Sequence, residues 1–218
     1  HQDLDLTNYL RVFHYLNYKN PDIIIHCANI NGSDSLKPNL DMFLNLREYH
    51  KGRIIYFGSG SEFRNENEYS LSKLIMNTIA QFSDNIYNLR LYGVFGKYEK
   101  ETRFPTTIIR NTLNNKPTII KHKIQFDYLY IKDLCRIVEL FINQTPLFHD
   151  YDICTNNQFY LKDIARLLTS DIIEKYAYLS YNHYGGSNYR FLAEFPFKFT
   201  PLKDALKEYY EDYRKSTA

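Results

Sequence analysis

The 218-residue sequence carries a net charge of +2, with 27 basic and 25 acidic side chains spread along the chain. A chain of this length can bury a sizeable core, in one large domain or in a domain with a smaller lobe. The mixed charge argues against a nucleic-acid-binding surface, and no run of about 18 apolar residues predicts a membrane span.

The three cysteines, Cys27, Cys135 and Cys154, are too far apart to form a CxxC motif. Cys27 and Cys135 lie in apolar patterns, which predict small buried residues rather than metal ligands or disulfide partners. Free thiols fit a reducing compartment. We therefore expect a soluble, cytoplasmic protein without a metal site.

Helical and extended patterns alternate over the first hundred residues. Helices are expected over residues 4–18, 39–49 and 69–82, and strands over residues 22–28, 53–57 and 86–91. The first two strands are runs of β-branched and aromatic residues, as in strands that are buried on both faces. The alternation is typical of the Rossmann-like α/β class, a doubly wound parallel sheet that binds ligands beyond the carboxyl ends of its strands.

The alternation changes in the second half of the sequence. Helices are expected over residues 105–114, 131–143, 160–169 and 202–213, and extended segments over residues 116–120, 126–130 and 151–154. We therefore predict a sheet domain over residues 1–100, to which residues 124–143 return. Residues 101–218 are expected to form mainly a smaller α+β lobe.

The most informative stretch runs from residue 53 to residue 73. Its strand ends in a Gly-Ser-Gly-Ser turn at residues 58–61, and Tyr69 and Lys73 follow at the start of a helix. Residues four apart share one face of a helix, so these two side chains point the same way. A lysine ammonium beside a phenol lowers the phenol's pKa and prepares it for proton transfer. We infer a proton-transfer site in which the Ser59 hydroxyl holds the oxygen that Tyr69 protonates.

The Tyr-xxx-Lys spacing alone is a weak signal in a chain with 21 tyrosines. The same spacing occurs in two other pairs, Tyr15/Lys19 and Tyr128/Lys132. Neither of those pairs follows a strand that ends in a Ser/Gly turn. The alternative for Tyr69 and Lys73 is a pair on a solvated helix surface, and the preceding turn favours proton transfer. For His26, a buried histidine beside its strand is favoured over a ligand.

The order and spacing of these segments resemble the extended short-chain dehydrogenase/reductases, specifically the NAD-dependent epimerase/dehydratase group that modifies nucleotide sugars. The motifs that carry the resemblance are DIIIHCA, PNLDMFLNL with Asn39 and Asn45, the serine turn followed by Phe63, the Tyr-xxx-Lys pair, LRLYGVFG, RFPTTIIRN, KPTII, FDYLYIKDL and FTPLKDALKEYYEDY. Together they cover nearly the whole chain.

The resemblance implies roles for particular residues. Tyr69 would be the acid/base, Lys73 would lower its pKa and bind the nicotinamide ribose, and Ser59 would orient the sugar carbonyl with support from Asn39. The residues that would line NAD or NADP are Cys27, Ala28, Asn29, Tyr69, Lys73 and Val94. The expected substrate contacts are Ser61, Arg103 and Lys123. Arg103 ranks first for a substrate phosphate because a guanidinium fork suits that group.

The resemblance also divides the chain into a cofactor domain over residues 1–100 and a substrate-binding lobe that is formed mainly by residues 101–218. None of the eight glycines forms the GxGxxG pattern whose backbone amides cradle a pyrophosphate. We therefore expect that the first strand and the Gly-rich segment of the family lie upstream in the intact protein.

The residues near Ser59 exclude some of the reactions that enzymes of this family catalyse. A 4,6-dehydratase has an acidic pair where this chain has Gly60 and Ser61. The GDP-fucose synthetase type uses a cysteine and a histidine where this chain has Ser61 and Arg103. Reduction of a nucleotide-linked keto sugar, or its epimerisation, remains. We expect a role in surface polysaccharide biosynthesis and a homodimer formed through the helix over residues 69–82. The alternative is a catalytically silent relative that binds a nucleotide sugar or a partner.

Overall fold

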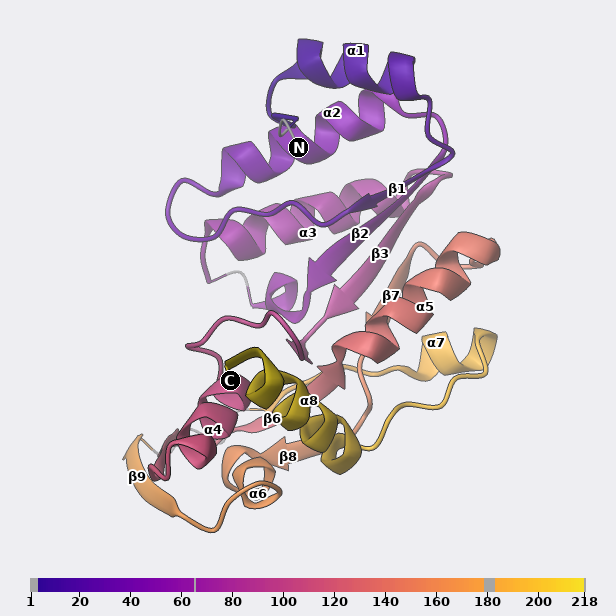
Figure 1. Cartoon of the computed structure of the whole chain (residues 1–218). Helices are drawn as coiled ribbons and strands as arrows, with labels where there is room; N and C mark the ends of the chain where they lie inside the picture. Colours follow the sequence, from indigo (N-terminus) through magenta and orange to yellow (C-terminus); the bar gives the residue numbers. More distant parts are fainter. Residues whose placement is uncertain (1–3, 65, 179–182, 218) are drawn as a thin grey trace. The chain divides into compact units, whose positions relative to one another are not determined.

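The computed structural model describes residues 4–64, 66–178 and 183–217. The chain divides into two compact units (Figure 1). The first comprises His1–Leu91 and Phe141–Asp152, and the second comprises Tyr92–Leu140 and Ile153–Ala218. Residues 141–152 belong to the first unit, and strand β7 pairs with β3 of that unit. The expected cofactor domain over residues 1–100, with residues 124–143 returning to it, stays a prediction.

The first unit contains a four-stranded sheet in the order β1-β2-β3-β7. The strands are β1 (Ile23–His26), β2 (Arg53–Ser59), β3 (Ile86–Leu91) and β7 (Asp150–Ile153). The helices are α1 (Tyr9–Lys19), α2 (Leu36–Tyr49), the 3-10 helix η1 (Gly60–Phe63) and α3 (Glu68–Gln81). β1 and β3 both run parallel to β2. The predicted Rossmann-like α/β class is confirmed.

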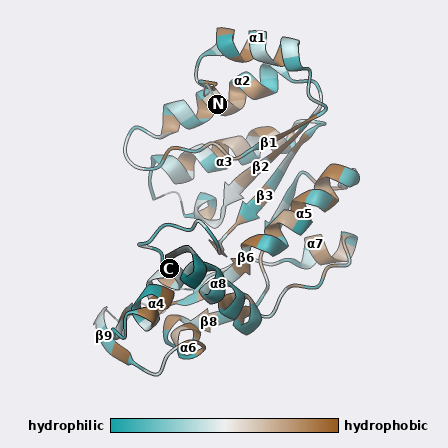
Figure 2. Cartoon of the chain, viewed as in Figure 1, coloured by the Kyte–Doolittle hydropathy of each residue, from teal (hydrophilic) through white to brown (hydrophobic). Residues whose placement is uncertain are grey.

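Helices α1, α2 and α3 of the first unit lie side by side in this order along its sheet (Figure 1). One apolar cluster joins them to the sheet. It comprises Val12, Leu16, Phe43, Leu46, Ile54, Tyr56, Met76, Ala80 and Ile86. Figure 2 shows the apolar residues concentrated along β1 and β2. Because these side chains recur at helical spacing in α1, α2 and α3, each helix buries one stripe and exposes the opposite one.

Two predictions about burial are wrong. β1 was expected to be fully buried, but Ile25 is 41% exposed and only His26 of this strand is buried. Within the described residues β1 pairs with β2 alone, so one edge of the strand is open. Cys27 directly follows this edge strand and Cys135 lies on the outer side of a helix, and both are exposed; Cys154 is buried.

The second unit contains a sheet in the order β10-β6-β4, with β8 antiparallel to β6, and a separate parallel pair β5-β9. Its strands are β4 (Gly93–Phe95), β5 (Thr118–His122), β6 (Gln125–Tyr130), β8 (Gln158–Tyr160), β9 (Ile172–Tyr178) and β10 (His183–Tyr184). Its helices are α4 (Phe104–Leu113), α6 (Leu161–Arg166), α7 (Tyr189–Glu194) and α8 (Leu202–Thr217), and α5 (Ile131–Asn143) spans the division. Residues of β4, β6, α4, α6 and α8 form its apolar core.

Candidate functional site

Helix α3 begins with a capping box that fixes the position of Tyr69 and Lys73. The Asn67 side chain accepts the backbone N–H of Ser70 at 2.9 Å, and the Ser70 hydroxyl in turn accepts the backbone N–H of Asn67 at 3.0 Å. This reciprocal pair satisfies two N–H groups that the first turn would otherwise leave open. Tyr69 therefore lies in the first turn of α3, and Lys73 lies one turn further along the same face.

The Lys73 side chain is buried, with 5% of its surface exposed. Its ammonium donates a hydrogen bond of 2.7 Å to the carbonyl oxygen of Phe57 and lies 5.6 Å from the centre of the Tyr69 ring. Burial lowers the pKa of Lys73 to about 8, and the negative charge of Glu62 opposes this shift. A buried ammonium that touches the last residues of β2 is a suitable partner for a phenolate.

Ser59 ends β2 and caps the following 3-10 helix. Its Oγ accepts the backbone N–H of Ser61 at 3.2 Å and the Ser61 hydroxyl at 2.9 Å. Ser59 is 7% exposed. Hydrogen bonds therefore hold the two serines together at the carboxyl end of β2. Ligands bind at this edge of a parallel sheet.

Asn39 connects three elements around the same edge. Its Oδ1 accepts the backbone N–H of Ile30 at 2.8 Å, and its Nδ2 donates to the carbonyl of Ile30 at 2.9 Å. The same Nδ2 lies 3.4 Å from Oγ of Ser72, on α3. Asn39 is 3% exposed and thus fixes the loop that follows β1, where the predicted cofactor residues Cys27, Ala28 and Asn29 are exposed.

His26, at the end of β1, is buried, and the positive charge of Lys73 acts on it. Burial, together with the smaller effect of the positive charge of Lys73, lowers the pKa of His26 to about 4. Its ring centre is 6.5 Å from that of Phe43. The histidine is therefore neutral at physiological pH, in agreement with its interpretation as a buried side chain.

The neutral state of His26 makes the stability of the protein depend on pH. In the unfolded chain His26 takes up a proton below about pH 6.5, whereas in the folded chain it does so only below about pH 4. Stability should therefore fall as the pH drops through this window, by about 3 kcal/mol in all. Urea unfolding between these pH values should show a smaller loss for His26→Phe than for the unmodified protein. Equal losses would contradict the buried neutral state.

Three predicted site residues lie in the second unit. Val94 is in β4, opposite Leu129 of β6. Arg103 precedes α4 and pairs with Glu99 at 3.4 Å, and Lys123 lies between β5 and β6. Ser59, Ser61, Tyr69, Lys73 and Asn39 all lie in the first unit. The catalytic and binding roles of all the predicted site residues stay predictions.

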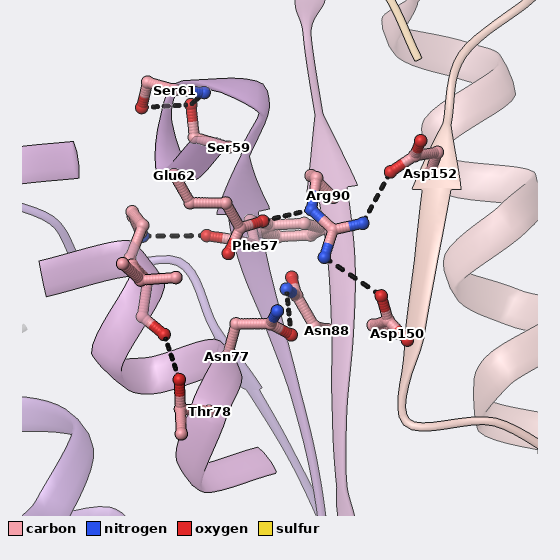
Figure 3. Close-up of polar contacts among 12 residues, drawn as sticks. Phe57, Ser59, Ser61, Glu62, Asn77, Thr78, Asn88, Arg90, Asp150 and Asp152 are labelled. Atoms are coloured by element: carbon pink, nitrogen blue, oxygen red, sulfur yellow. Dashed lines mark hydrogen bonds and ion pairs between the residues drawn. The ribbon is translucent and has the colours of Figure 1, made fainter. Parts of the chain in front are cut away.

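The sequence interpretation missed a buried group of charges beside the serine turn. Arg90 of β3 lies between Glu62 of η1 on one side and Asp150 and Asp152 of β7 on the other (Figure 3). The signal was present, because Arg90 is the one charged residue of a buried strand, Ile86–Leu91. A buried arginine requires carboxylate partners, and the sequence alone did not indicate which they were.

Two further observations concern metals and membranes. Within the described residues, no group of three or more His, Cys, Asp or Glu side chains is arranged to hold a metal ion. In the same part of the chain, no helix combines the length and the apolar composition needed to cross a membrane.

The comparison with protein families identifies the class. The family model for the NAD dependent epimerase/dehydratase family matches residues 1–154, and the chain belongs to this family. No curated protein is significantly similar to the sequence.

Solved structures of this fold include three enzymes with bound ligands. RMD from Pseudomonas aeruginosa, complexed with NADPH, superimposes with a TM-score of 0.85 at 16% identity, over 99% of this chain and 88% of that one. UDP-glucose 4-epimerase from Thermotoga maritima, with UDP-glucose, gives 0.84 at 14% identity over 98% and 84%. The dTDP-glucose 4,6-dehydratase from Bacillus anthracis, in complex with NAD, gives 0.81 at 15% identity over 97% and 78%. At these identities the likeness establishes the fold.

Proposed function

We propose that this chain belongs to an NAD(P)-dependent enzyme that reduces or epimerises a nucleotide-linked keto sugar, with Tyr69 as the acid/base. The observation that carries the proposal is the buried ammonium of Lys73, 5.6 Å from the centre of the Tyr69 ring and bonded to the end of β2. Membership of the family, and structural neighbours that hold NAD, NADPH or UDP-glucose, support it.

The residues at this edge fit a nicotinamide cofactor. The loop after β1 presents the small side chains of Cys27 and Ala28 at the surface, where a flat ring or a ribose can approach the backbone closely. Lys73 supplies an ammonium with three hydrogen-bond donors beside Tyr69. When bound, the cofactor would supply or accept the hydride at the sugar carbon.

The protein's own residues would manage the proton. In reduction the Tyr69 phenol donates its proton to the carbonyl oxygen, and the Lys73 ammonium stabilises the phenolate that remains. In the oxidative half of an epimerisation the same phenolate removes the proton from the sugar hydroxyl. Ser61 donates two hydrogen bonds to the Ser59 oxygen and so holds Ser59 at the carboxyl end of β2, where the serine would orient the carbonyl oxygen.

Titration of the intact protein with NADH and NADPH by calorimetry tests the proposal. We expect saturable binding of at least one of them, and oxidation of the bound nicotinamide when a nucleotide-linked keto sugar is added. Lys73→Met should weaken nicotinamide binding, whereas Lys19→Met, from a pair with the same Tyr-xxx-Lys spacing, should leave it unchanged. Binding of a nucleotide sugar without any nicotinamide binding would overturn the proposal in favour of a catalytically silent relative.

The remaining parts of the proposal concern the setting of the enzyme. We place it in the cytoplasm, in surface polysaccharide biosynthesis, with Arg103 as the first candidate for a substrate phosphate and with Ser61 and Lys123 as further substrate contacts. A homodimer would form through α3, in which Leu74, Ile75 and Ile79 are half-buried, and through Phe82 directly after it, which is 86% exposed. Exposed apolar residues beside a helix are a common feature of such interfaces.

A further inference from the structure

Glu62 is an unusual residue for its position. It lies in η1, one residue after Ser61, and its side chain is 1% exposed. A short 3-10 turn at the end of a strand needs no buried charge for its own formation. Burying a carboxylate is unfavourable unless a cation compensates its charge.

Arg90 provides that compensation and ties η1 to the sheet. Its Nε binds the Glu62 carboxylate, while its other nitrogens donate to Asp152 at 2.6 Å and to Asp150 at 3.0 Å (Figure 3). The guanidinium also lies 4.6 Å from the centre of the Phe63 ring. Arg90 is 4% exposed, so the whole fork is held in one orientation between η1 and β7.

The carboxylate of Glu62 also influences the proton-transfer site directly. Its charge acts on the Lys73 ammonium and raises the pKa of that group against the effect of burial. Among the described residues, His26 of β1 and Tyr69 of α3 also interact with Lys73. Around Glu62 they are Arg90 and Asp150, with the Tyr56 phenol and the Asn88 amide beside them.

We propose that Glu62 is a positioning residue: its bond to Arg90, which Asp150 and Asp152 of β7 hold in turn, fixes the turn that carries Ser59 and Ser61. This inference rests on the proposed function, because it assigns Glu62 to the same proton-transfer site. Glu62 touches none of the reacting groups and acts through Ser59 and Lys73. A neutral residue of similar size would preserve the packing but not the charge.

The first test measures the titration of Lys73 in Glu62→Gln. NMR of the protein with 13C-labelled lysine side chains gives the readout. The unmodified protein should titrate near pH 8, and Glu62→Gln should titrate at a lower pH because the neighbouring negative charge is gone. Glu66→Gln is the matched control, since Glu66 is exposed and lies outside this cluster. It should leave the titration of Lys73 unchanged.

The second test separates charge from geometry with Glu62→Asp, which keeps the carboxylate but shortens its reach by one methylene. We expect Lys73 to titrate nearly as in the unmodified protein, while the backbone amide signals of Ser59 and Ser61 shift. In turnover assays kcat should fall about tenfold with KM within about twofold, because the serine contributes to the transition state more than to binding. The alkaline limb of the rate profile should move only in Glu62→Gln.

The outcomes distinguish a wrong role for Glu62 from a wrong proposed function. If Lys73 titration and the Ser59 and Ser61 signals are the same in Glu62→Gln and Glu66→Gln, the positioning role is wrong. If Glu62→Gln does not fold, unchanged Ser59 and Ser61 signals in Glu62→Asp contradict the role equally. The NMR measurements need neither cofactor nor substrate, so a failure to bind nicotinamide would contradict the proposed function without deciding the role of Glu62.

Discussion

Tyr69→Phe is expected to lower turnover by about a thousandfold, within the range of 10²–10⁴ that general acid–base groups contribute. The substitution removes one oxygen atom and leaves the ring that lies beside Lys73. Without the phenol the site loses the group that would give a proton to the carbonyl oxygen or remove one from the hydroxyl. Nicotinamide binding should persist, since Lys73 and the loop after β1 are unchanged.

The matched control is Tyr18→Phe. Tyr18 lies in helix α1, with the ammonium of Lys19 4.9 Å from the centre of its ring, and it is 81% exposed. Its turnover should equal that of the unmodified protein. Steady-state assays of both variants, with cofactor binding measured alongside, distinguish a lost acid/base from a general loss of structure. Full turnover in Tyr69→Phe would exclude the proposed mechanism.

Arg90→Met is expected to have the largest effect on stability, a loss of about 3–5 kcal/mol, as for other buried ion pairs that lose one partner. The variant keeps most of the side-chain volume but leaves the buried Glu62 carboxylate without its cation. Asp150 and Asp152 are 18% and 16% exposed, so water compensates them in part. The free energy of unfolding, from urea denaturation followed by circular dichroism, measures the loss.

The pH dependence of this variant gives a second check. Burial already raises the pKa of Glu62, and Arg90 opposes that shift. Without Arg90 the pKa rises further, so the folded variant takes up a proton more readily than the unfolded chain. The deficit relative to the unmodified protein should therefore shrink as the pH falls. Arg214→Met removes an exposed pair with Glu211 and should cost less than about 1 kcal/mol. Equal stabilities for the two variants would contradict the role of the cluster.

Local patterns predicted the elements that position the site. The strand from Arg53 was expected because β-branched and aromatic residues run without interruption to Gly58, and the structure extends it to Ser59. The helix that carries Tyr69 was expected within a residue of its observed bounds from the helical pattern that opens at Tyr69, and the structure adds the capping box of Asn67 and Ser70. These features depend on neighbours in the sequence, which the sequence shows directly.

Features that depend on distant residues were not predictable in the same way. The pattern of β1 is that of a buried strand, and its exposure depends on which strands pair with it. The partners of Arg90 come from residues 62, 150 and 152, which only the pairing of β2, β3 and β7 brings together. β9 was missed for the same reason, because its partner β5 lies more than fifty residues earlier (Thr118 faces Ile172).

The buried cluster around Arg90 also has a consequence for how this sequence can change over generations. Glu62, Arg90, Asp150 and Asp152 form one network of charges. A substitution at one position therefore changes what the other residues contribute to the free energy of unfolding. The effects of substitutions in such a network do not add. A neutral residue at position 90 becomes acceptable only after position 62 has lost its charge. The order of substitutions is thereby constrained, and related sequences should exchange these residues as a set.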